Sequence, residues 1–216
     1  MGAAILGSGD EGSPMDRKLR AIVFDMGNVL MTFDGPYFAS RFTDTPEDAA
    51  LLNDALFGAP IWALLDSGTV SHETALRVAA AHLPERLRPN LDECFHHWPE
   101  LSEPLEEVND LAIRLKDEGY QIYVLSNANV NIMAQLGHAP ATPHLDGVVV
   151  SGIERIMKPD PAIFHLLCER YGHAPEECIF IDDNADNCEG ARIAGMHAYH
   201  FTGDAAELEA TIRALG

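Results

Sequence analysis

Carboxylates stand at the ends of two apolar runs of this sequence. Asp25 directly follows AIVF, and Asp182 and Asp183 close the run CIFIDD. A lone carboxylate in a buried strand costs several kcal/mol unless it is paired or binds a metal. We therefore expect Asp25 at an exposed strand tip or beside a cation. Lys158 is one candidate cation, because the chain holds only three lysines against eleven arginines and a lysine offers a compact point charge.

The apolar runs alternate with helical patterns along much of the chain. We expect strands at 20–25, 121–126, 147–151, 178–182 and 197–201, and helices at 104–118, about 129–136, 160–171, 185–194 and 204–214. This alternation predicts an α/β fold with a Rossmann-like parallel sheet flanked by helices. Ligands bind beyond the carboxyl ends of the strands in such sheets. Asp25, Ser126, Asn127 and the pair 182–183 are therefore expected at one edge.

The interval 35–103 has a different pattern. It contains no convincing strand and reads as several helices broken by prolines and glycines. A helical cap inserted after the first strand is the simplest interpretation. The predicted organisation is a flexible leader at 1–16, an α/β core made of 17–34 and 104–216, and a cap at 35–103.

Composition limits the partners of this chain of 216 residues. Its formal net charge of −20 argues against nucleic-acid backbones and anionic membranes. No apolar run approaches the ~18 residues that a membrane span needs. Four cysteines without CxxC spacing and no signal-peptide pattern favour reduced thiols and a cytoplasmic location. An anionic substrate would need a locally cationic site, and the oligomeric state stays open.

Four sequence motifs carry a family resemblance. In chain order they read VFDMGNVL, VLSNAN, KPDPAIF and FIDDNADN followed by AGMHAYHF. Their order and context resemble the four motifs of the haloacid dehalogenase-like hydrolases. The first is closest to the FD-x-G-N-V pattern of sugar-phosphate phosphatases and epoxide-hydrolase amino-terminal domains. The resemblance spans about residues 20 to 202 and implies an α/β hydrolase core with a cap.

The resemblance implies roles for the reacting groups. Asp25 would be the nucleophile that attacks phosphorus and forms an aspartyl-phosphate, which water then hydrolyses. A phosphomonoester dianion repels a carboxylate, so positive charge is needed on the transferring oxygens. Lys158 would supply part of this charge. Mg²⁺ would supply the rest, held by Asp25, the backbone carbonyl of Gly27 and Asp183.

Supporting roles follow from the same resemblance. Ser126, with its hydroxyl and the backbone N–H groups that follow it, would hold a phosphoryl oxygen, with Asn127 beside it. Asp182 and Asn187 would support the metal site. For each of these residues a purely structural role, such as a turn or a helix cap, is the alternative interpretation.

Gly27 departs from the family pattern. Most phosphatases of this superfamily carry there an aspartate that protonates the leaving alcohol. Its loss costs on the order of 10²–10⁴ in rate if nothing replaces it. Asp34 is a candidate replacement, although a helix N-cap or turn role in FDGP is the favoured interpretation. A cap side chain, solvent or a good leaving group are further options.

The function predicted from the sequence is Mg²⁺-dependent hydrolysis of a small phosphorylated metabolite, with a sugar phosphate as one candidate. Two alternatives stay open. A 2-haloacid dehalogenase would use the same aspartate without a metal. A phosphate-binding or regulatory protein would have lost activity with the aspartate that Gly27 replaces.

Overall fold

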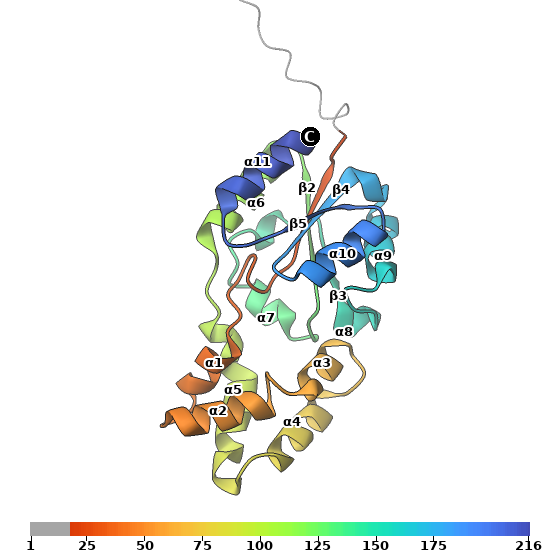
Figure 1. Cartoon of the computed structure of the whole chain (residues 1–216). Helices are drawn as coiled ribbons and strands as arrows, with labels where there is room; N and C mark the ends of the chain where they lie inside the picture. Colours follow the sequence, from red (N-terminus) through yellow and green to blue (C-terminus); the bar gives the residue numbers. More distant parts are fainter. Residues whose placement is uncertain (1–17) are drawn as a thin grey trace, which may run out of the picture.

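The computed structural model describes residues 18–216, so the leader predicted at 1–16 lies outside the described residues. Five strands form one sheet in which every pairing is parallel, in the order β3-β2-β1-β4-β5. The strands are β1 Ala21–Phe24, β2 Gln121–Ser126, β3 Gly147–Val150, β4 Cys178–Asp182 and β5 His197–His200. The predicted α/β class with a Rossmann-like sheet is confirmed (Figure 1).

Strand β1 lies in the middle of the sheet because all four of its residues are apolar. Side chains alternate between the two faces of a strand. Ile22 and Phe24 enter the apolar cluster on one face, whereas Ala21 and Val23 enter the cluster on the other. The backbone N–H of Asp25 donates to the Ile181 carbonyl at 2.8 Å. The strand pairing therefore carries on as far as the carboxylate.

Helices cover both faces of the sheet. The helices that follow the strands are α6 Glu106–Asp117, α7 Ile132–Leu136, α8 Ser151–Glu154, α9 Pro161–Tyr171, α10 Ala185–Ile193 and α11 Ala205–Leu215, with 3₁₀ turns at Thr142–His144 and Pro175–Glu177. Apolar residues of α6 and α11 pack on one face, and those of α9 and α10 pack on the other. The sheet is thereby dry on both sides, as its continuous apolar strands require.

Two helix boundaries differ from the sequence prediction. Helix α7 begins at Ile132 instead of about 129, because the side chain of Asn129 accepts from the Asn131 N–H at 3.0 Å and holds a turn there. The short helix α8 was not predicted. Four residues between a strand and a turn leave no periodic pattern to detect.

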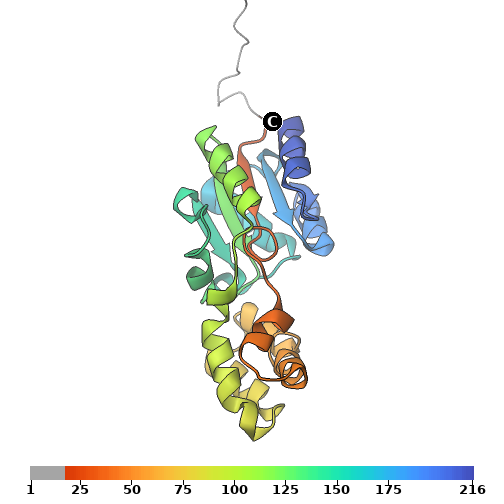
Figure 2. The same ribbon diagram turned by 90° about the vertical axis from the view of Figure 1, so that its left-hand side faces the viewer.

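The segment between β1 and α6 forms a separate helical unit. It contains α1 Gly35–Arg41, α2 Pro46–Ala55, α3 Pro60–Asp66, α4 His72–Ala81, α5 Arg88–His97, and 3₁₀ turns at Glu85–Leu87 and Trp98–Leu101. These elements share an apolar cluster of their own, which is distinct from the two clusters of the sheet. We call residues 35–101 the insert, and it lies beyond one end of the sheet in both ribbon views (Figures 1 and 2).

Two linkers join the insert to the sheet and pair with each other. The Thr32 N–H donates to the Glu103 carbonyl at 2.8 Å, and the Leu105 N–H donates to the Leu30 carbonyl at 2.9 Å. This short antiparallel contact occupies the residues just before α6 and delays its start to Glu106. The chain therefore passes from the sheet into the insert and returns at the same point.

Membrane crossing was tested on helix length and composition. Within residues 18–216 no single helix is both long and apolar enough to span a bilayer. The bent pair α2 and α3 meets these two criteria only when taken together. Its buried side chains pack in the apolar cluster of the insert.

Candidate active site

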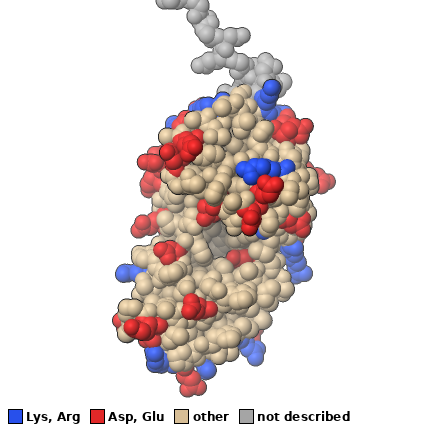
Figure 3. Space-filling model, viewed as in Figure 1, with Lys and Arg blue, Asp and Glu red and all other residues tan. Residues whose placement is uncertain are grey.

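A cavity of about 300 Å³ opens between the carboxyl edge of the sheet and the insert. Several predicted site residues line it, namely Asp25, Gly27, Ser126, Asn127 and Asp183. The space-filling view shows the molecule hollowed between the sheet and the insert (Figure 3). The strand ends therefore bring residues more than 150 positions apart in the sequence to one place.

Lys158 lies beneath this cavity and contacts two carboxylates at once. Its Nζ is 2.8 Å from Asp25 Oδ1 and 2.7 Å from Asp182 Oδ2, and it donates to the Leu125 carbonyl at 3.1 Å. The lysine side chain is fully buried. Burial alone would lower the pKa of Lys158, but the two carboxylates outweigh it and raise that pKa. The ammonium group is thus held in its charged form.

Asp25 is the predicted nucleophile and is 8% exposed. Burial raises the pKa of its carboxyl group above the ordinary value, Lys158 opposes this shift, and the nearby charge of Asp182 adds to it. Asp25 lines the cavity, and the single ammonium group of Lys158 is shared between Asp25 and Asp182. That leaves negative charge that a further cation would neutralise.

Asp182 is anchored by more groups than Lys158 alone. Its Oδ1 accepts from the Asn184 N–H at 2.7 Å, and the side-chain amide of Asn187 lies 3.1–3.2 Å from both carboxylate oxygens. Asp182 is fully buried. With its oxygens occupied in this way, Asp182 fixes the ammonium of Lys158, and Asn187 fixes Asp182. Both residues thus support the site from below the cavity.

Asp183 turns the other way, toward the cavity. Its Oδ2 accepts from the side-chain amide of Asn28 at 3.1 Å. Ligand atoms of Asp25, Asp182 and Asp183 all lie within 4.8 Å of one another. This clustering of carboxylate oxygens, with the surplus negative charge described above, fits a hard divalent cation such as Mg²⁺.

The strand end of β2 supplies Ser126 and Asn127. Ser126 is 3% exposed and lines the cavity. The Asn127 side chain makes two hydrogen bonds to the main chain of Lys158, donating to its carbonyl and accepting from its N–H, both at 2.9 Å. The amide of Asn127 therefore positions the lysine. Asn127 also lines the cavity, and its place beside a phosphoryl group stays a prediction.

Asp34 does not line the cavity. Its side chain accepts from the Tyr37 N–H at 2.9 Å and caps helix α1 at its N-terminus, where Asp34 is exposed. This is the N-cap arrangement that the FDGP pattern favoured. The cavity next to Gly27 is instead shared with another insert carboxylate, Asp66.

Asp66 ends helix α3 and is 8% exposed. Its Oδ1 accepts from the Asn129 side-chain amide at 3.2 Å, and its carbonyl accepts from Ser151 Oγ at 2.6 Å. Burial raises the pKa of Asp66 to about 7, although the hydrogen bonds from Asn129 oppose this shift. These bonds tie the insert to the loops that follow β2 and β3.

Gly68 allows this close approach. Its φ of +69° lies in the left-handed region, and a Cβ there would meet the Gly152 carbonyl oxygen at 2.3 Å. Any larger residue would push the insert away from α8. The insert wall of the cavity is completed by Phe33, Trp62 and Trp98, whose rings contact one another with centroids 5.4–6.1 Å apart.

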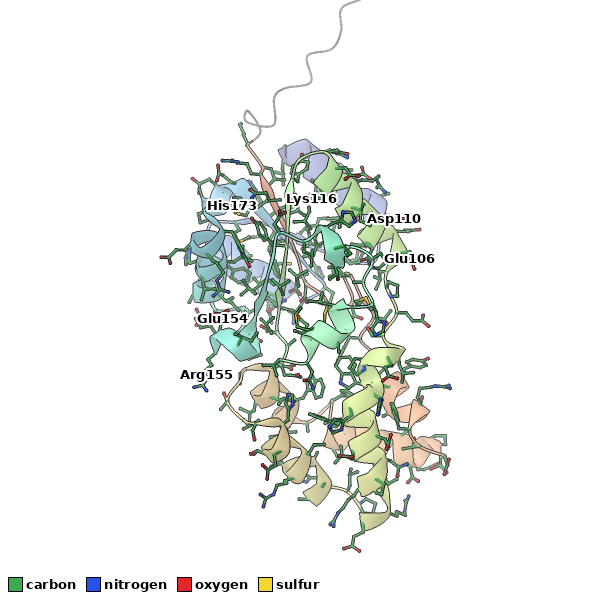
Figure 4. All side chains as sticks on the ribbon, turned by 180° about the vertical axis from the view of Figure 1, so that it is seen from behind. Glu106, Asp110, Lys116, Glu154, Arg155 and His173 are labelled. Carbon is green, nitrogen blue, oxygen red and sulfur yellow. The ribbon has the colours of Figure 1, made fainter. Side chains whose placement is uncertain are left out.

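Residues at the far end of the sheet take no part in this site. The buried His173 is 3.0 Å from the Tyr123 hydroxyl, and in Figure 4 it lies with Lys116 at the end remote from the insert. The pKa of His173 is lowered by burial. This histidine is therefore a neutral packing residue.

Sequence reasoning missed several residues of the site. Asn28 stands within the first motif and has a φ of 55°, a left-handed value that asparagine tolerates better than most residues. Asp66, Asn129 and Gln135 reach the cavity from helix ends and from α7. The asparagine within DMGN was a usable sign for Asn28, whereas nothing in one sequence indicated which insert residues face the sheet.

The comparisons agree with this geometry. Residues 19–195 match the model of a hydrolase family described as haloacid dehalogenase-like hydrolase. Phosphatase MT3486 of Mycobacterium tuberculosis is 28% identical over 198 residues, which cover 84% of this chain and 86% of that protein. (S)-2-haloacid dehalogenase 4A of Burkholderia cepacia is 32% identical over 145 residues, covering 64% of this chain and 58% of that protein.

A solved structure shows the same fold. It is a HAD family enzyme of Bacteroides thetaiotaomicron in a magnesium complex, with 21% identity and a TM-score of 0.72. The match covers 89% of this chain and 99% of that one. The same enzyme has also been solved with magnesium and inorganic phosphate.

Proposed function

Because the chain belongs to the haloacid dehalogenase-like hydrolases, we propose that it is a Mg²⁺-dependent phosphatase acting on a small phosphomonoester. The observation that carries the proposal is the contact of buried Lys158 with both Asp25 and Asp182 at the edge of the cavity. In this contact the carboxylate that we propose as the nucleophile lies 2.8 Å from a buried ammonium group. The comparison with Phosphatase MT3486 supports the same reaction class.

In the proposed mechanism an Asp25 oxygen attacks phosphorus and the bond to the leaving alcohol oxygen breaks. Lys158 neutralises negative charge on the phosphoryl group, and Ser126 donates to one of its oxygens. The leaving alkoxide takes up a proton from solvent water. Water then attacks phosphorus, which releases inorganic phosphate and regenerates the Asp25 carboxylate.

The metal site fits the residues present. Asp25, Asp183 and the Gly27 carbonyl would hold Mg²⁺, as they are three oxygen donors next to an uncompensated negative charge. The ion would supply positive charge to the reacting phosphoryl oxygens. Asn28 would keep Asp183 oriented through its 3.1 Å hydrogen bond.

The dehalogenase alternative is favoured by the relative from Burkholderia cepacia. A 2-haloacid carries a carboxylate that needs a cationic partner. Among the described residues that line the cavity there is no lysine or arginine, and Lys158 is already shared by two acids. This arrangement disfavours the dehalogenase, and halide release without magnesium is its direct test.

The remaining assignments are also proposals. A cytoplasmic location is supported by Cys94, Cys168, Cys178 and Cys188, which are all free thiols. The small phosphorylated metabolite as partner, and the exclusion of nucleic acid and membranes, rest on the charge of −20 and the cavity. The branch of the family indicated by the first motif stays a prediction.

A phosphatase screen with and without Mg²⁺ tests the proposal. We expect turnover of phosphomonoesters that depends on the metal and is lost in the Asp25→Asn variant. If wild-type protein is no faster than this variant over a broad panel, the regulatory alternative is correct. Halide release from haloacids without metal would instead establish the dehalogenase.

A further inference from the structure

Gln135 lines the cavity and carries a side-chain oxygen without a hydrogen-bond partner. The residue is 1% exposed and lies on α7. Its Oε1 is buried and has no hydrogen-bond donor within the described part of the chain. A buried acceptor left unpaired is costly, and native proteins rarely keep one without a reason.

The network around Gln135 fixes which amide atom is free. Ser102 Oγ donates its single hydrogen to the Thr32 carbonyl at 2.6 Å. Towards Gln135 the Ser102 hydroxyl can therefore only accept, and it accepts from Nε2 at 2.7 Å. Turning the amide over would place two acceptors against each other. Oε1 is consequently the free atom, and it can only accept.

The rest of the cavity is free of basic residues. The described side chains that line it include carboxylates, amides and the rings of Phe33, Trp62 and Trp98, but no lysine or arginine. Arg155, which follows α8, lies at the outer edge of the molecule and is not part of the lining (Figure 4). A leaving group with its own negative charge would thus meet no side chain of opposite charge among these lining residues.

We propose that Gln135 is a specificity-determining residue whose Oε1 accepts a hydrogen bond from a hydroxyl of a neutral leaving group. This inference rests on the proposed phosphatase function. The matching substrate class is a phosphate ester of a small uncharged polyol, whose C–H faces pack on the aromatic rings while its hydroxyls meet acceptors. The volume of about 300 Å³ suits one such group.

The proposal excludes two classes of leaving group. A carboxylate-bearing alcohol, as in phosphoglycolate, adds repulsion with Asp183 and offers no donor to Gln135. A purely apolar alcohol packs on the rings but leaves Oε1 unpaired. Sites built to bond a hydroxyl reject analogues that lack it, because the buried partner is then left without a bond.

The test compares kcat/KM with Mg²⁺ for a hexose 1-phosphate, each of its monodeoxy analogues, phosphoglycolate and p-nitrophenyl phosphate. For wild-type protein we expect the hexose ester to exceed phosphoglycolate, and one deoxy analogue to lose about tenfold. In the Gln135→Met variant, kcat/KM for that deoxy analogue should be no lower than kcat/KM for the parent hexose ester. Gln135→Met should also lower kcat/KM about tenfold more for the hexose ester than for p-nitrophenyl phosphate.

Met133→Gln is the matched control, because Met133 lies two positions away on α7 and is 58% exposed. It should leave kcat/KM unchanged for every ester. Preference for phosphoglycolate, no loss with any deoxy analogue of the wild type, or an equal loss for all esters in Gln135→Met would overturn the inference. Turnover of none of the esters would instead refute the phosphatase itself. The deoxy series on the wild type needs no variant to fold.

Discussion

The two sides of the cavity are built in opposite ways. We call Asp25, Lys158, Asp182 and Asp183 the floor, and Phe33, Trp62, Trp98 and Asp66 the roof. The floor is charged and cross-linked by ion pairs and hydrogen bonds from the ends of three strands. The roof is mainly aromatic and held by ring contacts and a few bonds to the loops. In the proposed function the chemistry belongs to the floor, and selection belongs to the roof together with Gln135 of α7.

Asp25 and Asp66 show this contrast in one residue type. Both are 8% exposed, and burial raises the pKa of both carboxyl groups. Lys158 opposes the shift at Asp25, whereas Asp66 has only the amide groups of Asn129. Burial thus raises both pKa values, and the contrast lies in the partners: Asp25 has an ammonium group that stabilises its charged form, whereas Asp66 has none.

The largest effect is expected at the floor. Asp25→Asn removes the attacking oxygen but keeps the shape of the side chain. Turnover of p-nitrophenyl phosphate with Mg²⁺ should fall by roughly 10⁴-fold or more, as for other enzymes that lose their nucleophile. Steady-state kinetics with a circular-dichroism melting curve checks this. Retained turnover would mean that the floor does not carry the chemistry.

The second change removes the shared cation. Lys158→Met leaves Asp25 and Asp182 buried without their common partner, which should lower the free energy of unfolding by about 3–5 kcal/mol. Urea denaturation followed by circular dichroism measures this. The matched control Lys116→Met breaks an exposed ion pair with Asp146 and should cost about 0–1 kcal/mol. Equal losses for the two variants would contradict the role assigned to burial.

The third change tests the roof through pH. The pKa of Asp66 is raised from 3.8 to about 7, so the folded protein holds this proton more tightly than the unfolded chain. The free energy of unfolding should therefore fall progressively, through the ionisation of Asp66, as pH rises from about 4 to about 7. Asp66→Asn removes this titration and keeps an acceptor for Asn129. The difference in unfolding free energy between the two proteins should change by a few kcal/mol across that window.

Urea denaturation at a series of pH values supplies these data. A difference that is constant from pH 4 to pH 7 would show that Asp66 is ionised normally in the folded protein. The roof would then be as charged as the floor, and the contrast between them would disappear.

The smallest effect is expected at Asp34. Because this residue caps helix α1 and is exposed, Asp34→Ala should cost about 1 kcal/mol of stability and leave turnover unchanged. Thermal unfolding and kinetics with a hexose 1-phosphate check both points. A rate loss on the order of 10² would instead identify Asp34 as the proton donor that replaces the aspartate absent at position 27.

The sequence predicted the sheet more fully than the roof. Strands such as Ala21–Phe24 are continuous apolar runs, so their type, order and polar ends were visible in the chain. Helix α8 and the start of α7 were not, because α8 has only four residues and a turn held by the Asn129 side chain delays α7. Neither feature leaves a periodic pattern in the sequence.

The candidate site divides in the same way. Asp25 and Asp183 could be placed together because parallel strands end at one edge, and the family resemblance added Lys158 to them. The bond between Asn127 and the main chain of Lys158 could not be foreseen, since it joins two loops far apart in the sequence. The same holds for Asp66, which reaches the cavity through the packing of the insert on the sheet, and for Gln135, which reaches it from α7.

One measurement tests the central claim most directly. Wild-type protein with Mg²⁺ and a hexose 1-phosphate is quenched in acid during turnover, and its peptides are analysed by mass spectrometry. A phosphoryl group on Asp25, absent from Asp25→Asn, is the predicted result. Steady turnover with no phosphoryl group on Asp25, or with one on another residue, would contradict the account.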